Sequence, residues 1–226
     1  MSMDTVAMPG RSNKTKIRNR AEVFIKPKHP ANSKYYYSWK FMVPNNAEEF
    51  VDDEESDRHG YHIIGQWHEE DHIKPICKKP HPPITLTYKH SKDTSGYRNL
   101  GLTYGLKCQD ENAKILNNKE FYKIINPIKK GDWVKIVFGI YWSSESEGYL
   151  QVWVNDSPVI FEGQKGTMRS GDILPTKLHG ANMYTRASDS RAIPNYLKLG
   201  HYRSRHTYPS TIYFDDFGIT TEYPNG

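Results

Sequence analysis

The sequence predicts a single all-β domain, built as a sandwich or a barrel. Its 226 residues are enough for one ordinary domain with a sizeable core, and too few for two independent units. Aromatic residues make up 13% of the chain, and 16 Gly and 14 Pro accompany them. Such a composition favours strands and turns over helices, so it excludes a helix bundle.

Nine segments have the composition of strands, and Gly, Pro, Asn and Asp separate them at intervals typical of a sandwich or barrel. The predicted strands are 17–26, 35–43, 61–67, 84–89, 100–107, 133–142, 149–154, 196–202 and 211–221. One short helix is expected at about 120–125. The domain spans 17–226, and the polar segment 1–16 is expected to be a flexible N-terminal tail.

The balance of charge favours a polyanionic partner. Lys and Arg number 31 against 26 Asp and Glu, which gives a formal net charge of +5 at pH 7. No apolar run approaches the roughly 18 to 20 residues that a membrane-spanning helix needs, so a membrane-embedded protein is excluded. The two cysteines, Cys77 and Cys108, are too few for a four-thiolate zinc site and leave open whether they form a disulfide.

Three of the predicted strands each carry a row of mostly polar side chains at alternate positions. The rows are Arg18, Arg20 and Glu22; Gln66 and His68; and Tyr196, Lys198, Gly200 and Tyr202. Side chains on a strand point alternately to opposite faces, so each row shares a face. Trp67 and the leucines Leu197 and Leu199 fall on the core side, and Gly200 leaves a gap where a ligand can approach closely.

Two further strands show the same alternation. Along 133–142 and 149–154 the aliphatic residues share one face, which leaves Lys135, Trp153 and the following Asn155 on the other. A sheet face that carries Trp, Asn and Lys is a candidate sugar-binding surface. The alternative is a polar sheet face with a stray aromatic residue.

Arg, Gln, His, Lys and Tyr on neighbouring rows fit a site that breaks an acidic sugar chain by β-elimination. The reaction needs the carboxylate of a 4-linked uronic acid neutralised, its carbon-5 proton removed and its carbon-4 oxygen protonated. We expect Gln66 and Arg20 to bind the carboxylate and stabilise the enolate-like charge. His68 suits the base. Tyr202, beside Lys198 or Arg203, suits the acid and is a second candidate for the base. No metal is required.

These motifs resemble those of the jelly-roll polysaccharide lyases. The family 7 alginate lyases show an Arg-x-Glu strand, a Gln-x-His strand and a Tyr-x-Lys-x-Gly-x-Tyr strand, and all three rows occur here in that order. The Gln-Trp-His form and the segments 152–155 and 212–216 resemble more closely the glucuronan lyases of family 20 and heparin lyase I of family 13. The resemblance implies a jelly-roll sandwich of two antiparallel sheets, similar to concanavalin A. It also implies that Gln66 and Arg20 bind the carboxylate, while His68 and Tyr202 handle the protons.

The resemblance further implies a polysaccharide lyase that acts on a uronic-acid polymer, with a glucuronan-like β-1,4-glucuronate chain as the first choice. The expected substrate-binding residues are Arg18, Lys135, Trp153, Asn155, Tyr196, Lys198 and Arg203. We expect a secreted, extracellular monomer, whose signal peptide is absent from this sequence, with an acidic polysaccharide as partner and neither nucleic acid nor membrane. The alternative is a non-catalytic, lectin-like module for acidic polysaccharide.

Two carboxylates near the last strand, Asp215 and Asp216, are weak candidates for holding a structural calcium ion, since hard cations prefer oxygen ligands. A simple turn or edge pair of carboxylates is the favoured interpretation. Nucleic-acid binding would also use basic charge and exposed rings, but the Lys and Arg residues are spread along the chain and no binding motif is present.

Overall fold

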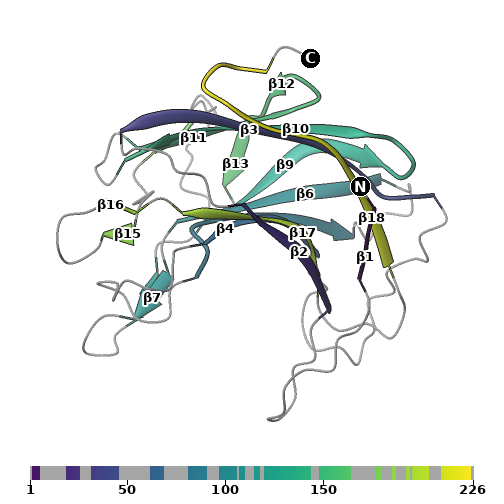
Figure 1. Ribbon diagram of the computed structural model, residues 1–226, viewed down its shortest axis with the longest axis horizontal. Helices are drawn as coiled ribbons and strands as arrows, with labels where there is room; N and C mark the ends of the chain where they lie inside the picture. The colour runs from purple at the N-terminus through teal and green to yellow at the C-terminus, as the bar shows by residue number, and fades with distance from the viewer. Residues whose placement is uncertain are drawn as a thin grey trace, which may run out of the picture.

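The computed structural model contains two stacked antiparallel β-sheets (Figure 1). It describes residues 2–5, 19–25, 32–45, 62–68, 81–90, 97–105, 107–109, 115–117, 120–143, 148–163, 177–179, 185–186, 192–193, 195–203 and 210–224. All regular elements in these ranges are strands. Within these ranges no helix is long and apolar enough to span a membrane.

The first sheet has the order β1-β18-β3-β10-β11-β12, with β14 beside β11. Its strands are β1 (Ser2–Thr5), β3 (Ser33–Met42), β10 (Val134–Trp142), β11 (Tyr149–Val154), β12 (Ser157–Pro158), β14 (Leu178–His179) and β18 (Ser210–Thr220). Neighbouring strands pair antiparallel throughout. In Figure 1 this sheet is the upper layer.

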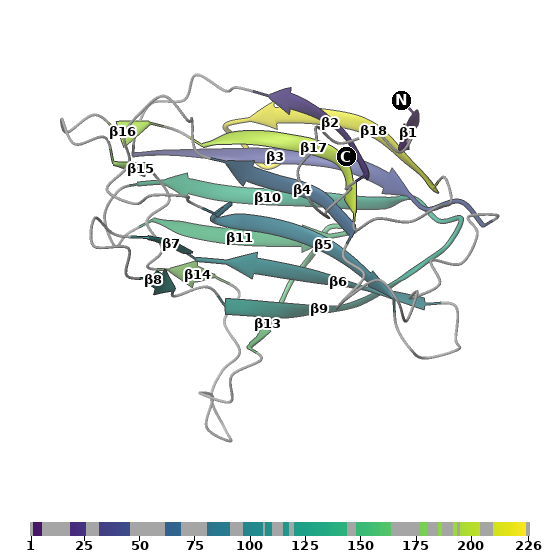
Figure 2. The ribbon, with the colours of Figure 1, turned by 90° about the horizontal axis from the view of Figure 1, so that it is seen from below.

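The second sheet has the order β13-β9-β6-β5-β4-β17-β2. Its strands are β2 (Asn19–Ile25), β4 (His62–His68), β5 (Ile84–His90), β6 (Tyr97–Tyr104), β9 (Glu120–Lys129), β13 (Phe161–Gly163) and β17 (Tyr196–Arg203). Two small antiparallel pairs accompany it: β7 (Lys107–Gln109) with β8 (Ile115–Asn117), and β15 (Thr185–Arg186) with β16 (Ala192–Ile193). Figure 2 views this sheet from below, with β2, β17, β4, β5, β6 and β9 side by side.

The core between the sheets is rich in aromatic rings. Trp67 of the second sheet lies 4.8 Å from Phe138 and 5.4 Å from Tyr37 of the first sheet, measured between ring centroids. Trp39 stacks on Phe138 at 5.3 Å, and the Trp142 indole nitrogen donates a hydrogen bond of 2.9 Å to the Tyr37 hydroxyl. All five side chains are fully buried, so they fix how the two sheets pack.

The predicted fold class is confirmed, and each of the nine predicted strand segments overlaps an observed strand. The helix expected at 120–125 is wrong, because this stretch is the first half of β9. There Tyr122 pairs with Leu102 and Ile124 with Leu100 of β6, and Ile124 is fully buried. Pairing with β6 therefore overrides the local preference.

The N-terminal segment contributes one described strand, β1, which pairs with β18. Residues 6–18 lie outside the described residues, so the flexible tail over 1–16 stays a prediction. Cys77 also lies outside them, and its pairing with Cys108 stays open.

Two of the register shifts in the second sheet lie in the strands that carry the predicted rows of polar residues. One lies between β4 and β5 at Ile63 and Gly65, and the other between β17 and β4 at Leu199 and Tyr202. Gly200 lies within the second shift and has a φ of +147°, a conformation that side-chain-bearing residues rarely adopt. A Cβ atom at this position would come within 2.2 Å of the Ala21 carbonyl oxygen.

We predict that Gly200→Ala destabilises the protein by at least about 2 kcal/mol, because both the φ angle and the neighbouring backbone oppose a side chain. Gly218→Ala is the matched control, since its Cβ would meet only the Ser38 hydroxyl, at 3.3 Å. Denaturant unfolding of the two variants measures the difference. Equal stability of the two would contradict the constraint at Gly200.

Candidate active site

The outer face of the second sheet brings the three predicted rows together on adjacent strands. β17 lies between β2 and β4, so its residues pair with residues of both strands (Figure 2). Tyr202 pairs with Arg20. Gly200 pairs with Glu22, and Lys198 pairs with Gln66. The alternation predicted from sequence thus holds for these residues.

A buried carboxylate connects the rows. Gln66 Nε2 donates a hydrogen bond of 2.5 Å to Glu22 Oε1, and Arg20 Nε lies 3.0 Å from Glu22 Oε2. Gln66 and Glu22 belong to strands on either side of β17, so this contact crosses β17 where Gly200 has no side chain. The Glu22 side chain is 1% exposed and that of Arg20 is 42% exposed, so arginine forms the solvent-facing part of the cluster.

The contact between Glu22 and Gln66 also determines which ring nitrogen of His68 carries the hydrogen. A carboxylate only accepts hydrogen bonds, so the nitrogen of the Gln66 amide faces Glu22 and its oxygen faces the other way. His68 Nε2 lies 3.1 Å from that oxygen, Gln66 Oε1. The oxygen is an acceptor, so His68 Nε2 must be the donor. In a neutral ring, Nδ1 is then the nitrogen that can accept a proton.

A second group on this face is aromatic. Tyr196 stacks between Phe24 and His68, with ring centroids 5.9 Å and 6.0 Å away. The Lys198 ammonium lies 5.1 Å from the Phe24 centroid and 5.4 Å from that of Tyr196. Phe24 is 58% exposed, so the group combines an open apolar ring with a cation.

The register separates the two predicted proton-handling residues. Tyr202 pairs with Ile63 of β4, whereas His68 lies five residues further along that strand and pairs with Tyr196. At about 3.3 Å per residue, this places their backbones roughly 16 Å apart along β4. Tyr202 instead lies against Arg20, whose guanidinium carbon is 4.2 Å from the ring centroid. His68 belongs with the aromatic group, and Tyr202 belongs with Arg20.

Several predicted substrate-binding residues lie elsewhere. Lys135 on β10 and Trp153 on β11 belong to the first sheet, as does Asn155 in the turn that follows β11. These three therefore do not share a face with Gln66. Arg203 is 1% exposed, because alternation from Tyr202 turns it toward the interior, where burial lowers its pKa to about 10. Arg18 lies outside the described residues.

Near Arg203 the interior holds a pair of buried histidines. His62 Nδ1 and His201 Nε2 are 2.9 Å apart, and their rings stack at 5.2 Å. Arg203 pairs with His62 across β17 and β4. This polar cluster faces the core, so it is separate from the outer-face site.

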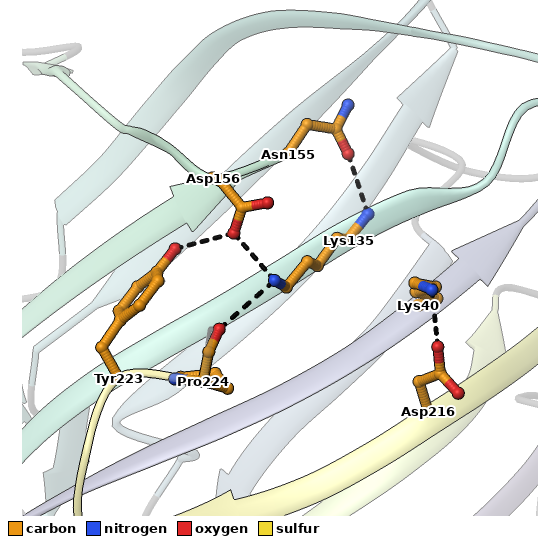
Figure 3. A network of polar contacts seen from close by, with 7 residues as sticks. All are labelled: Lys40, Lys135, Asn155, Asp156, Asp216, Tyr223 and Pro224. Atoms are coloured by element: carbon orange, nitrogen blue, oxygen red, sulfur yellow. Dashed lines mark hydrogen bonds and ion pairs between the residues drawn. The ribbon is translucent and has the colours of Figure 1, made fainter. Parts of the chain in front are cut away.

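Lys135 and Asn155 belong to a network of polar contacts on the first sheet (Figure 3). Lys135 Nζ lies 2.8 Å from an Asp156 carboxylate oxygen, and the Tyr223 hydroxyl donates to the same oxygen at 2.9 Å. The hydrogen bonds from Lys135 and Tyr223 lower the pKa of Asp156. Burial, together with the bond to Asp156, raises the pKa of Tyr223 to about 12. Asn155 Oδ1 accepts a hydrogen bond of 2.9 Å from the Lys135 backbone nitrogen.

The candidate calcium ligands lie beside this network. Asp216 Oδ2 forms an ion pair of 2.6 Å with Lys40 Nζ, which raises the pKa of Lys40. Across the described part of the chain, no three His, Cys, Asp or Glu side chains are grouped as metal ligands. The Asp216 carboxylate thus has a protein cation as its partner, and calcium at Asp215 and Asp216 stays a prediction.

The family comparison decides the class of protein. The polysaccharide lyase family profile matches residues 3–218, which is nearly the whole chain. The chain belongs to the polysaccharide lyase family. It is therefore an enzyme that acts on a polysaccharide, as the sequence motifs predicted. No curated protein sequence matches it significantly.

Solved structures with the same architecture include other lyases. The endo-β-1,4-glucuronan lyase from the fungus Trichoderma reesei is 14% identical, with a TM-score of 0.61 over 98% of this chain and 80% of that one. An alginate lyase from Pseudomonas aeruginosa is 13% identical, with a TM-score of 0.46 over 84% and 65%. A glycoside hydrolase family 131 domain from Coprinopsis cinerea is 15% identical, with a TM-score of 0.47 over 99% and 69%. At 14% identity, the glucuronan lyase supports the jelly-roll fold of this lyase and nothing finer.

Two residues of the site received no role from the sequence. Glu22 appeared only as a member of its row, although a carboxylate two positions from an arginine on a strand signals a same-face ion pair. Phe24 continues that row by two more positions, and its exposure became visible only in the structure. The positions of Glu22 and Phe24 on this face follow from the same alternation that identified Arg20.

We predict that His68 carries its ring proton on Nε2 at a pH where the imidazole is neutral. Long-range 1H–15N correlation spectra of the labelled protein measure this directly. Glu22→Ala removes the acceptor that orients Gln66, so we expect the ring nitrogen shifts to move toward a mixture of tautomers. The Glu22→Ala substitution should lower the free energy of unfolding by about 1–3 kcal/mol.

Glu222→Ala is the control for the loss of a carboxylate, since Glu222 is exposed and lies beyond β18. It should leave the His68 shifts unchanged. A wild-type ring protonated on Nδ1 would refute the assigned chain of hydrogen bonds.

Proposed function

We propose that this lyase cleaves a uronic-acid-containing polysaccharide by β-elimination and leaves an unsaturated uronate at the new non-reducing end. A β-1,4-linked glucuronate polymer is the first candidate substrate. The observation that carries the proposal is the cluster of Arg20, Glu22, Gln66 and Tyr202 on one sheet face. The motifs shared with glucuronan lyases, and the similar structure of one such enzyme, motivate the choice of polymer.

Arg20 and Gln66 bind and neutralise the uronate carboxylate in this scheme. Arg20 is the exposed cation of the cluster, and its remaining guanidinium N–H groups are suited to a carboxylate. The Gln66 amide has two N–H donors, of which one is used by Glu22. The second stabilises the enolate-like charge that develops as the carbon-5 proton leaves. Glu22 positions both groups and holds them in place before the substrate binds.

Tyr202 handles the protons. In a glucuronate the carbon-5 proton and the carbon-4 oxygen lie on the same side, so a single tyrosine can serve both steps. The phenolate takes the carbon-5 proton, the C–H electron pair forms the C4=C5 double bond, and the C4–O bond breaks. The phenol then donates its proton to the departing oxygen. The separation of His68 from Tyr202 supports this assignment, and His68 instead supports Gln66 through the 3.1 Å contact.

Phe24, Tyr196 and Lys198 extend the same face and are proposed to hold a neighbouring sugar unit. An open ring suits the apolar side of a sugar, and the lysine suits a second carboxylate. The proposed enzyme is a secreted, extracellular monomer that needs no metal for the reaction. Nucleic acid and membrane are not proposed as partners.

A lectin-like module that only binds acidic polysaccharide is the second candidate function. The exposed Phe24 and the Lys198 cation would serve binding alone. The alternatives differ in turnover, because only the lyase needs Tyr202 as a proton carrier.

We predict that Tyr202→Phe lowers kcat by about 10²–10⁴-fold, the usual contribution of a general acid or base. The substitution keeps the ring under Arg20, so folding and polymer binding should persist. Ultraviolet absorbance of the conjugated double bond measures cleavage across glucuronan, heparin-like polymers and alginate. His68→Ala should retain measurable activity.

Cleavage by Tyr202→Phe at a near wild-type rate would overturn the mechanism. No cleavage of any uronate polymer by the wild-type protein, with binding intact, would favour the lectin-like module.

A salt dependence follows from the cations on this face. We predict that Lys198→Met lowers kcat/KM for the polymer roughly tenfold at low salt, because it removes part of the attraction that steers a polyanion. The difference should shrink at 0.15 M, where the screening length is about 8 Å. Lys34→Met is the matched control, since Lys34 lies on β3 of the other sheet. An equal effect of both variants would show that net charge, and not the position of Lys198, matters.

A further inference from the structure

We propose that the outer face of the first sheet holds a second saccharide site, centred on Trp133, that binds an uncharged sugar chain. This face lies on the opposite side of the sandwich from the candidate active site (Figure 1). The inference does not depend on the mechanism proposed above.

Two hollows meet at Trp133. One has a volume of about 640 Å³ and extends from Trp133 across Lys135 to Asp216. The other, of about 550 Å³, lies on the side of the turn that contains Gly131. Trp133 and Asn155 line both hollows, so together the hollows form one continuous surface around the indole. Each hollow alone lies within the range of about 300–1,000 Å³ that is typical of ligand sites.

The indole of Trp133 is not part of the core. It is 44% exposed, whereas the other four tryptophans are buried or packed under neighbouring rings. Within the described ranges, no ring stacks on it and no side chain or carbonyl accepts its N–H. An exposed tryptophan between two hollows offers an apolar face for a sugar ring and a donor for a hydroxyl.

Hydrogen bonds and ion pairs connect the polar groups that line the larger hollow (Figure 3). Asn155 and Asp156 both have positive φ angles, 49° and 61°, in the tight turn that joins β11 to β12. Asn155 Oδ1 is bound to the Lys135 backbone, which leaves its amide nitrogen as a donor. The Lys135–Asp156 and Lys40–Asp216 ion pairs hold two further groups of hydrogen-bond donors and acceptors in place. Such fixed groups can bind hydroxyls without an ordering cost.

The charge of the lining identifies the class of saccharide. Its charged side chains are Lys40, Lys129, Lys135, Asp132, Asp156, Asp215 and Asp216. The aspartates exceed the lysines by one, and the two ion pairs already neutralise Lys40 and Lys135. A uronate polymer would meet net repulsion here, unlike at Arg20 and Lys198. The structure therefore assigns an uncharged chain to this site, which would hold the enzyme on a neutral glycan while the opposite face acts on an acidic one.

The test is binding of uncharged hexasaccharides of β-1,4-linked glucose, N-acetylglucosamine and mannose, measured by calorimetry. A β-1,4-linked glucuronate hexasaccharide, tested on the Tyr202→Phe protein, is the charged counterpart. We expect at least one uncharged chain to bind and Trp133→Ala to weaken it by about tenfold or more. Phe217→Ala is the matched control, because Phe217 is similarly exposed, at 40%, on β18 and lines neither hollow. The Phe217→Ala protein should bind the uncharged chain as tightly as the wild-type protein does.

Trp133→Ala and wild type should cleave a soluble uronate polymer at the same rate, which separates this site from the active site. Three outcomes would each overturn the proposal. They are no binding of any uncharged chain, equal binding by Trp133→Ala and wild type, and a glucuronate chain whose affinity falls with Trp133→Ala as much as that of the uncharged chain.

Discussion

The register of β4 is fixed by the burial of Trp67, and the candidate active site depends on that register. The indole is fully buried against Tyr37 and Phe138 of the facing sheet. A slip of one residue would turn every side chain of β4 to the other face. Exposing a side chain of this size costs roughly 4–6 kcal/mol at about 25 cal/mol per Å². The core therefore holds Gln66 and His68 on the outer face, where Glu22 completes their orientation.

Local sequence was sufficient for the strands and for the rows of the site, because alternation is a property of each strand alone. It placed Arg20, Gln66 and Tyr202 on one face, which the pairing of β2, β17 and β4 confirms. The prediction failed at 120–125, where the partners of β9 come from β6 and β13, which are distant in sequence. The same limit explains why Lys135 was grouped with residues of the second sheet. Alternation gives the side of a strand on which a residue lies, but not the sheet that the strand joins.

The distance between functional groups could not be predicted, because it depends on the register between neighbouring strands. The pairing of β17 with β2 places Tyr202 beside Arg20, and the pairing of Tyr196 with His68 places His68 near the other end of β17. A bulge shifts the pairing of β17 with β4 by one further residue. A bulge adds a residue to one strand without an obligatory sequence mark, although glycine at position 200 was a hint. Arg203 was within reach of the sequence, since its neighbour Tyr202 points outward and the next residue must point inward. The contact between Glu22 and Gln66 needed the structure, because it spans three strands.

The alternation of β2 and β17 also separates two kinds of selective pressure on this chain. Phe24 and Lys198 contact sugar in the proposed site, while their immediate neighbours Val23 and Leu199 pack into the interior. Substitutions at the outward positions can change which polymer is accepted without creating cavities in the core. Substitutions at the inward positions only have to preserve volume. Such a scaffold can change its outer face while its core stays intact. It also makes the outward positions of β2 and β17 the natural targets for redesigning specificity.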